Sequence, residues 1–210
     1  MAITINGTGS ITGLTAGGLP DGSIVADDLA SSLDLTGKTV TLPSGTGGKI
    51  LQVVQTVNSG VESTTVQDTY EDLSGMSVSI TPESTDSNIL ITVCIGKVGC
   101  SASAPRQTNF RLMRGTTTIA LGDQLGSRMR GAISSATTFE SNVAYSVGGL
   151  SFTFLDDPTY TLGDELTYKM QWGGQAGETH YINRSGGSTD SGDAPYCTTI
   201  SSIMAMEVAG

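Results

Sequence analysis

Catalysis by an imidazole side chain could involve only one residue, because His180 is the single histidine among 210 residues. A Ser-His-Asp or Cys-His arrangement would have to include it. His180 lies in the sequence GETHYINRS, which is typical of a strand edge, and no G-x-S-x-G motif supplies a nucleophilic serine. We interpret His180 as a structural or surface residue and predict no catalytic residue.

Phosphate-binding and metal-binding patterns are incomplete in this chain. In the glycine-rich sequence PSGTGGKI, Lys49 is followed by Ile50, whereas a phosphate-binding loop has serine or threonine there, so we interpret it as a linker. Cys94, Cys100 and Cys197 form neither a C-x-x-C pair nor an even set. One histidine and three scattered thiols lack the spacing of a zinc site. We predict no cofactor, no metal and no disulfide bond.

Two acidic pairs flank a short segment between two expected strands: Asp156 with Asp157, and Asp164 with Glu165. The two carboxylates of a glycoside hydrolase face each other across a pocket, which neighbouring turn residues do not imply. We interpret the pairs as turn residues that keep the surface soluble, and a weak calcium site is the alternative. A carbohydrate-active enzyme is therefore the weakest hypothesis for the function.

The composition argues against further classes of function. The chain has 10 basic and 20 acidic residues, and its net charge of −10 disfavours binding to a nucleic-acid backbone. No apolar run approaches the ~18 residues of a membrane span, so we expect no membrane insertion. The sequence from Met1 to Ser10 has neither a basic nor an apolar segment, so we expect no secretory signal peptide and a reducing site of synthesis.

Basic residues concentrate in the segment 97–130, whereas acidic residues predominate in 131–210. We expect ion pairs between these segments, within or between subunits; a positive rim that meets anionic sugars or an acidic protein is the alternative. Arg128, Arg130 and Trp172 are the candidate receptor contacts, because arginine pairs with anions and an indole ring stacks on sugars. For this single tryptophan a core position is the favoured interpretation, and contact with a ligand is the alternative.

A change of composition near residues 43–49 divides the chain into an N-terminal arm with its linker, residues 1–48, and a domain, residues 49–210. Before the change, isolated aliphatic residues are separated by glycine, serine and threonine, and no aromatic residue occurs. Such a segment buries too little apolar surface to offset its ordering entropy alone, so we expect it to become ordered against a partner. The residues expected to make this attachment are Ile3, Ile5, Ile11 and Leu14.

Alternation of apolar and polar residues with a period of two begins near residue 50 and predicts strands rather than helices. The expected strands include residues 51–57, 76–80, 89–95, 110–113, 117–121, 143–147, 151–155, 166–172 and 199–208. Turn residues, among them glycine, aspartate and asparagine, separate these segments. The pattern predicts an all-β antiparallel sandwich, with a jelly roll as the favoured topology.

The last expected strand is apolar on both faces, because Met204, Met206 and Val208 alternate with Ile203 and Ala205. A sheet with one face in water shows a cleaner alternation. Charged residues make up only 14% of the chain, against ~25% in typical soluble domains. We therefore predict a homo-oligomer with Met204, Met206 and Val208 at the interface between subunits.

ITINGTGSITGLTAGGLPDGSIVADDLAS, at residues 3–31, resembles the N-terminal arm of tail-fibre-like and other virion proteins of tailed bacteriophages, those of marine cyanophages in particular. The sequences that resemble a trimeric jelly-roll domain at the ends of such proteins are KILQVVQTV (49–57), LSGMSVSITPESTDSNILITV (73–93), FRLMRGTTTIALGD (110–123), SFTFLDDPTYTLGDELTYKMQW (151–172), THYINRS (179–185) and TISSIMAMEV (199–208). Together they cover nearly the whole chain.

The resemblance implies a jelly roll similar to those of tumour necrosis factor and C1q, packed as a homotrimer about a threefold axis. It also implies a non-enzymatic virion protein whose arm docks on other virion proteins. A short tail fibre or spike, whose head binds a glycan or protein of the host surface, is the first expectation. A capsid decoration or head-fibre protein is the alternative, because no shaft or repeat separates arm and head. The expected location is the virion, after synthesis in the host cytoplasm.

Overall fold

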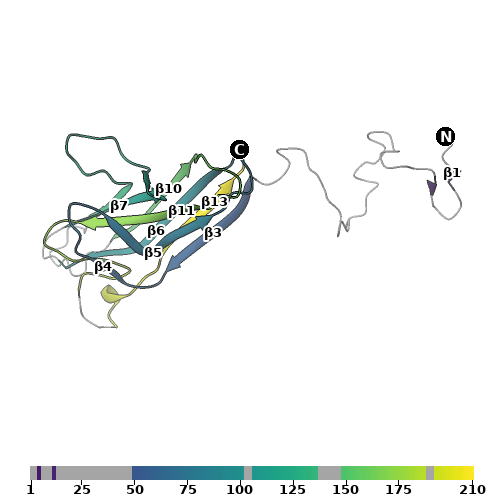
Figure 1. Cartoon of the computed structure of the whole chain (residues 1–210). Coiled ribbons are helices and arrows are strands. Elements are labelled where there is room, and N and C mark those ends of the chain that lie inside the picture. Colours follow the sequence, from purple (N-terminus) through teal and green to yellow (C-terminus); the bar gives the residue numbers. More distant parts are fainter. Residues whose placement is uncertain (1–3, 6–10, 13–48, 102–105, 137–147, 188–191) are drawn as a thin grey trace. The chain divides into compact units, whose positions relative to one another are not determined.

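The computed structural model describes residues 4–5, 11–12, 49–101, 106–136, 148–187 and 192–210 (Figure 1). The chain divides into two units, residues 1–47 and 48–210. In the first unit, β1 (Thr4–Ile5) pairs antiparallel with β2 (Ile11–Thr12), and Ile5 lies opposite Ile11. Ile3 and Leu14, the other two expected attachment residues, lie outside the described residues.

The first sheet of the second unit is antiparallel throughout (Figure 1). Its strands are β3 (Ile50–Asn58), β13 (Ser201–Val208), β6 (Asn88–Cys100), β10 (Gly148–Asp156) and the short strands β4 (Glu62–Thr64) and β12 (His180–Ile182). Ile91 of β6 lies opposite both Ala205 of β13 and Phe154 of β10, so β6 is an interior strand. β3 pairs with the other edge of β13, and β12 with β4 extends the sheet beside the far end of β6.

The second sheet is also antiparallel and has β11 and β7 at its centre. Its strands are β5 (Glu71–Ile80), β11 (Leu166–Gly174), β7 (Gln107–Arg114), β8 (Thr117–Ile119) and β9 (Ile133–Ala136). Along the chain, the long strands alternate between the sheets: β3, β6, β10 and β13 belong to the first, and β5, β7 and β11 to the second. This alternation, with the last strand beside the first, is the jelly-roll topology. The predicted all-β antiparallel jelly roll is therefore confirmed.

The core lies between the two sheets, because each long strand turns alternate apolar residues toward the opposite sheet. β6 contributes Ile89, Ile91, Val93 and Ile95, none of them more than 1% exposed. The residues that pack against them include Val78 and Ile80 of β5, Phe110 and Leu112 of β7, and Tyr168, Met170 and Trp172 of β11. Burial of each such side chain contributes ~1.5–3 kcal/mol, so these inward faces hold the sheets together.

One end of the sandwich is closed by a buried carboxylate. Glu207 of β13 accepts hydrogen bonds from the backbone N–H groups of Glu83 (2.9 Å) and Ser84 (3.1 Å) and from Gln52 Nε2 (2.7 Å). Burial acts to raise the pKa of this carboxyl, but the hydrogen bonds outweigh it and hold the pKa below its usual range. Glu207 thereby ties the connection between β5 and β6 to the last strand.

Asn183 holds the end of the sandwich where β13 begins. It is fully buried and has a left-handed backbone (φ 63°), which asparagine tolerates better than most residues. Its Nδ2 donates to the carbonyls of Asn58 (3.0 Å) and Gly60 (2.7 Å), and its Oδ1 accepts from Ser201 Oγ (2.7 Å). Its backbone N–H donates to the carbonyl of Lys97 (2.8 Å). One side chain therefore joins the turn after β3 to the start of β13, beside β6.

Candidate functional site

The outward-facing residues of the four long strands of the first sheet form a surface that we call the uncharged face. It consists of Val53, Gln55 and Val57 of β3, Ser202, Met204, Met206 and Val208 of β13, Leu90, Thr92 and Cys94 of β6, and Ser151, Thr153 and Leu155 of β10. None of these residues carries a charge. Strand register places Val53, Met206, Leu90 and Leu155 opposite one another in turn, as an apolar row across the sheet.

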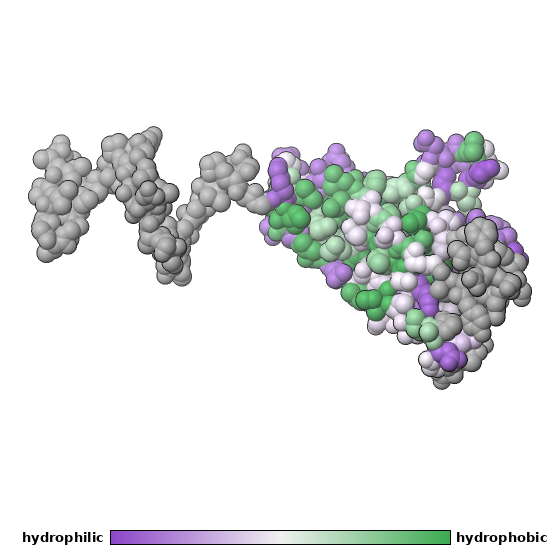
Figure 2. All heavy atoms as spheres, turned by 180° about the vertical axis from the view of Figure 1, so that it is seen from behind, coloured by the Kyte–Doolittle hydropathy of each residue, from purple (hydrophilic) through white to green (hydrophobic). Residues whose placement is uncertain are grey.

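Much of the uncharged face is in contact with solvent in the single chain. Val53, Val57 and Leu155 are 53%, 51% and 52% exposed. The residues that sequence analysis assigns to an interface, Met204, Met206 and Val208, all lie on this face and are half-buried. Figure 2 shows hydrophobic and near-neutral residues over most of the described surface that faces the viewer, with hydrophilic residues toward its ends. Exposed apolar patches of this kind are typical of sites that bind another protein.

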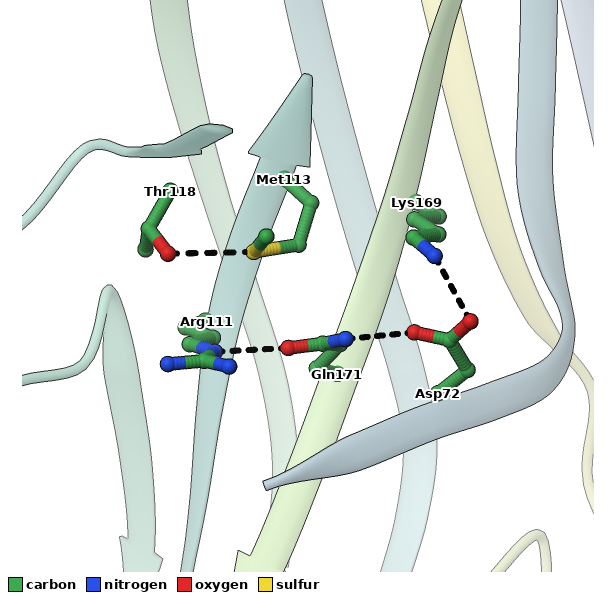
Figure 3. A network of polar contacts seen from close by, with 6 residues as sticks. All are labelled: Asp72, Arg111, Met113, Thr118, Lys169 and Gln171. Atoms are coloured by element: carbon green, nitrogen blue, oxygen red, sulfur yellow. Dashed lines mark hydrogen bonds and ion pairs between the residues drawn. The ribbon is translucent and has the colours of Figure 1, made fainter. Parts of the chain in front are cut away.

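The outer surface of the second sheet is different, and we call it the polar face. It consists of Asp72, Ser77 and Ser79 of β5, Thr167, Lys169 and Gln171 of β11, Arg111 of β7, and Thr118 of β8. A chain of side-chain contacts crosses three strands (Figure 3): Arg111 Nε donates to Gln171 Oε1 (2.7 Å), and Gln171 Nε2 donates to Asp72 Oδ1. Lys169 Nζ pairs with Asp72 Oδ2 at 2.6 Å.

Opposite charges and an aromatic ring stabilise this network. The hydrogen bond from Lys169, followed by that from Gln171, holds the pKa of the Asp72 carboxyl below its usual range. The Arg111 guanidinium lies over the Tyr70 ring, 4.5 Å from its centroid, which is a cation–π contact. Tyr70 donates its hydroxyl hydrogen to the carbonyl of Arg130 (2.9 Å), so the network reaches the loop between β8 and β9.

Arg128 and Arg130, two of the candidate receptor contacts, lie together in that loop, residues 120–132. Arg130 Nε donates to the carbonyl of Gly122 (2.6 Å), and Gln124 Nε2 donates to the carbonyl of Arg128 (3.0 Å). The loop is therefore folded on itself by its own hydrogen bonds. Two apolar side chains are exposed beside the arginines, Leu125 (66%) and Met129 (41%). Charged and apolar groups are thus presented on the same loop.

The third candidate receptor contact, Trp172, is not on the surface. Its side chain points into the core, is 2% exposed and stacks on Phe110 with ring centroids 6.4 Å apart. This confirms the core position favoured for the single tryptophan and corrects its assignment as a receptor contact. The reason is its position in β11, where Tyr168, Met170 and Trp172 alternate inward while Lys169 and Gln171 alternate outward.

Sequence reasoning missed the Arg111–Gln171–Asp72 contacts. The three residues come from strands that are far apart in the chain, and no local spacing indicates that they meet. One signal was present: Arg111 lies between the apolar residues Phe110 and Leu112, so a period of two places its side chain on the surface of a strand. The pairing of β7 with β11 and β5 could not be read from that pattern.

His180 is a fully buried structural residue, one of the two placements expected for it. Its Nδ1 lies 2.7 Å from Thr108 Oγ1 and its Nε2 lies 3.3 Å from the carbonyl oxygen of Gln175, so both ring nitrogens have partners. Burial lowers the pKa of the imidazole, because the charged form is poorly solvated. A Cβ at Gly174 would lie 2.1 Å from the ring, so only glycine leaves room for it.

One member of each acidic pair has a structural partner. Asp164 accepts a hydrogen bond from the backbone N–H of Thr161, as expected for a turn residue. Asp156 is 5% exposed rather than solvated, and it pairs with Arg114 (2.6 Å) and the Tyr168 hydroxyl (2.7 Å). Burial, and then Asp156 itself, hold the pKa of Tyr168 above its usual value. Among the described residues, no group of three histidine, cysteine or acidic side chains could hold a metal ion.

Among the described residues, two ion pairs join the basic segment 97–130 to the acidic segment 131–210. They are Arg114 with Asp156, at 2.6 Å, and Arg106 with Glu178, at 3.8 Å. The prediction of pairing between these segments is confirmed for these two contacts. Some basic residues of the segment 97–130 therefore form ion pairs within the fold. Arg128 and Arg130 lie instead in an exposed loop.

Comparison with known proteins places the chain in no family. No protein-family model and no curated protein matches the sequence. In the part of the chain that the structure describes, no helix has the length and hydropathy to cross a membrane. The two outer faces of the sandwich are the surface features from which a function can be inferred.

Proposed function

We propose that this protein is a non-enzymatic structural protein of a bacteriophage virion and assembles as a homotrimer. The uncharged face packs the subunits together, and the polar face with the loop 120–132 meets the host surface. The N-terminal arm docks on the tail, so that the protein acts as a short tail fibre or spike. The observation that carries the proposal is the contrast between the two outer faces, one without charge and one with a charged network.

Self-association through the uncharged face is supported by its chemistry. Contact through it desolvates no charge, and each Å² of apolar surface removed from water contributes ~25 cal/mol. Permanent subunit interfaces are more apolar than ordinary protein surface. The hydroxyl groups of Thr92 and Thr153 lie 3.4 Å apart, so part of the polar surface of the face can be buried with partners.

The polar face is unsuited to the same role. Covering it with the uncharged face of another subunit would remove the Asp72 carboxylate and the Arg111 guanidinium from water without giving them new polar partners, which costs several kcal/mol per ion. We therefore assign this face to the outside of the assembly. Arg128 and Arg130 add positive charge beside exposed apolar side chains, a combination that fits an anionic glycan or an acidic protein of the host surface.

The assignment to a virion is supported by the resemblance of residues 3–31 and 49–208 to phage proteins. In the arm, the short pair of β1 and β2 sets Ile5 opposite Ile11, two of the four expected attachment residues. An extended glycine-rich segment can pair its backbone with the sheet edge of a partner, with aliphatic side chains in shallow pockets. Attachment to other virion proteins therefore needs no separate core in the arm.

Two measurements test the proposal. Light scattering of the purified protein is expected to give three times the mass of one chain, and a monomer at micromolar concentration would contradict the assembly. Electron microscopy of virions labelled with an antibody to residues 49–210 is expected to place the protein on the tail. Label over the capsid would instead support a capsid decoration or head-fibre protein, and unlabelled particles would contradict both virion roles.

Host binding is tested with the double variant Arg128→Ala, Arg130→Ala in the assembled protein. We expect binding to host cells to fall at least about tenfold, because the loop loses both of its cations. Lys49→Ala is the control, since Lys49 is an exposed cation outside the loop. If the double variant binds host cells as well as the wild-type protein does, the arginines of the loop do not contact the host surface.

A further inference from the structure

A lysine and a cysteine that are about 100 positions apart meet where the chain approaches β13. Lys97 of β6 is 7% exposed, and its Nζ donates to the carbonyl of Cys197 (2.9 Å). The same Nζ lies 3.3 Å from Cys197 Sγ. Cys197 itself is exposed and follows the short 3₁₀ helix η2 (Ala194–Tyr196). A buried nitrogen nucleophile is thus held against a sulfur that soluble reagents can reach.

The backbone on both sides fixes this contact. The carbonyl of Lys97 accepts a hydrogen bond from the N–H of Asn183, whose own carbonyl accepts from the N–H of Thr199. Gly96 permits the close approach, because a Cβ there would lie 2.2 Å from the carbonyl oxygen of Ile200. The N–H of Cys197 donates to the carbonyl of Ala194 (3.3 Å). The two reacting atoms are therefore positioned by the fold and not by chance contact of mobile side chains.

We propose that Lys97 and Cys197 form a reversible covalent S–N bond when a peroxide oxidises the thiol. The Cys197 thiolate attacks hydrogen peroxide, the O–O bond breaks, and sulfenic acid and hydroxide are formed. The neutral amine of Lys97 then attacks the sulfur and expels the sulfenic oxygen, which leaves as water with a proton from the amine. Sulfur is oxidised by two electrons, peroxide is reduced, and the S–O bond is replaced by an S–N bond.

The other two cysteines provide the contrast. Cys94 is exposed on the uncharged face, where its neighbours across the sheet are Ser202 and Ser151. Cys100 is buried in β6 beside β12. The cross-strand neighbours of Cys94 carry hydroxyl groups and no amine, so a sulfenic acid at Cys94 has no comparable nitrogen beside it across the sheet. The bond at Cys197 would fasten the approach to β13 onto β6, which restricts the unfolded chain and stabilises the fold.

The experiment treats the full-length protein with hydrogen peroxide in mildly alkaline buffer. Digestion with trypsin and mass spectrometry is expected to find the peptides of Lys97 and Cys197 joined, with the mass of the pair less two hydrogens. Cleavage after Lys97 is expected to be lost, and dithiothreitol is expected to restore both peptides. Oxidation of Cys197 to sulfinic acid with cleavage after Lys97 intact would overturn the proposal, as would a joined pair that retains an oxygen atom.

Variants separate this bond from other oxidation products. Cys197→Ser is expected to abolish the joined peptide, and Cys94→Ser is expected to leave it unchanged. Lys97→Arg keeps a cation but removes the amine, so Cys197 should then stop at sulfenic acid or go on to sulfinic acid. Because Lys97 is buried, this variant is first checked for a native circular dichroism spectrum. If it does not fold, two other results test the proposal. One is the loss of the joined peptide in the Cys197→Ser variant. The other is a rise in the melting temperature of oxidised wild-type protein that dithiothreitol reverses.

Discussion

Met206 of β13 lies directly opposite Leu90 of β6, and both side chains point away from the core. The substitution Met206→Asp places a carboxylate in the middle of this apolar row. In the proposed trimer it would be buried without a partner, which costs about 3 kcal/mol or more per subunit. We expect light scattering to find mostly monomer at a concentration where wild-type protein is trimeric.

Ser77→Asp is the matched control for this substitution. Ser77 is exposed on the polar face, opposite Lys169 of β11, so an added carboxylate remains in water there. The control is expected to remain trimeric and to melt at nearly the wild-type temperature. If both variants dissociate to the same extent, or if neither dissociates, the uncharged face is not the interface between subunits.

The reactivity of the Cys94 thiol tests whether assembly covers the uncharged face. In the single chain its thiol is exposed, as is that of Cys197. Assembly through the uncharged face covers Cys94 and leaves Cys197 open, so alkylation of Cys94 is expected to be at least about tenfold slower in the trimer. Peptide mapping after brief treatment with iodoacetamide measures the two rates. In Met206→Asp protein the rate at Cys94 is expected to approach that at Cys197, and fast alkylation of Cys94 in intact trimer would place the interface elsewhere.

Because of Glu207, we expect the free energy of unfolding to fall as the solution becomes acidic. Because its folded-state pKa lies below the unfolded value, the stabilisation is complete above about pH 4.3 and is lost as the pH falls through the folded-state pKa. Glu207→Gln removes the charge that accepts the N–H groups of Glu83 and Ser84, and we expect a loss of about 1–3 kcal/mol at pH 7. Urea unfolding at several pH values measures both effects. Glu165→Gln, at an exposed turn position, is the control and should change neither.

Because of His180, we expect the free energy of unfolding to depend on pH in a second, higher range as well. Its folded-state pKa is lowered by burial, so its contribution to stability is complete above about pH 6.5 and is lost as the pH falls toward the folded-state value. Since the chain has no other histidine, a change in stability between about pH 7 and 5.5 reports on this residue. We expect His180→Gln to be less stable at pH 7 by about 1–2 kcal/mol and to lose this pH dependence. Persistence of the dependence in the variant would assign it to other groups.

Deletion of residues 1–42 tests the division between arm and sandwich. Residues 48–210 contain their own core and form a separate unit, so the truncated protein is expected to melt at nearly the wild-type temperature and to remain a trimer. It should no longer be incorporated into virions, because the proposed attachment residues are gone. Incorporation of the truncated protein, detected by immunoblot of purified particles, would show that the arm is not the anchor.

Period-two alternation predicted most of the long strands, because a strand with one face in the core repeats its side chains every second residue. It did not identify β4, β9 or β12, which have three, four and three residues and are too short to show a period. The expected strand at 143–147 lies outside the described residues. In β3, a period of two places Leu51, Val53 and Val57 on one face, and that face points away from the core.

The candidate site was harder to predict than the fold. Arg128 and Arg130 could be found as charges in a basic segment, but the burial of Trp172 depends on which face of β11 meets the core. Alternation alone identifies two faces and does not say which one is inside when both contain apolar residues. The contact of Lys97 with Cys197 depends on the path of the chain between β12 and β13, for which the sequence has no local signal.

Asn183 has a consequence for the chemical ageing of the protein. Its side-chain nitrogen donates to two carbonyl oxygens, those of Asn58 and Gly60, while its side-chain oxygen accepts from Ser201. Hydrolysis of the amide to a carboxylate would replace the donor by a negatively charged acceptor that faces both carbonyls. Aspartate therefore cannot take over this position, and each hydrolysed chain would lose the connection between the turn after β3 and the start of β13. Partial unfolding, which exposes the buried amide to water, would therefore lead to a permanent loss of this connection.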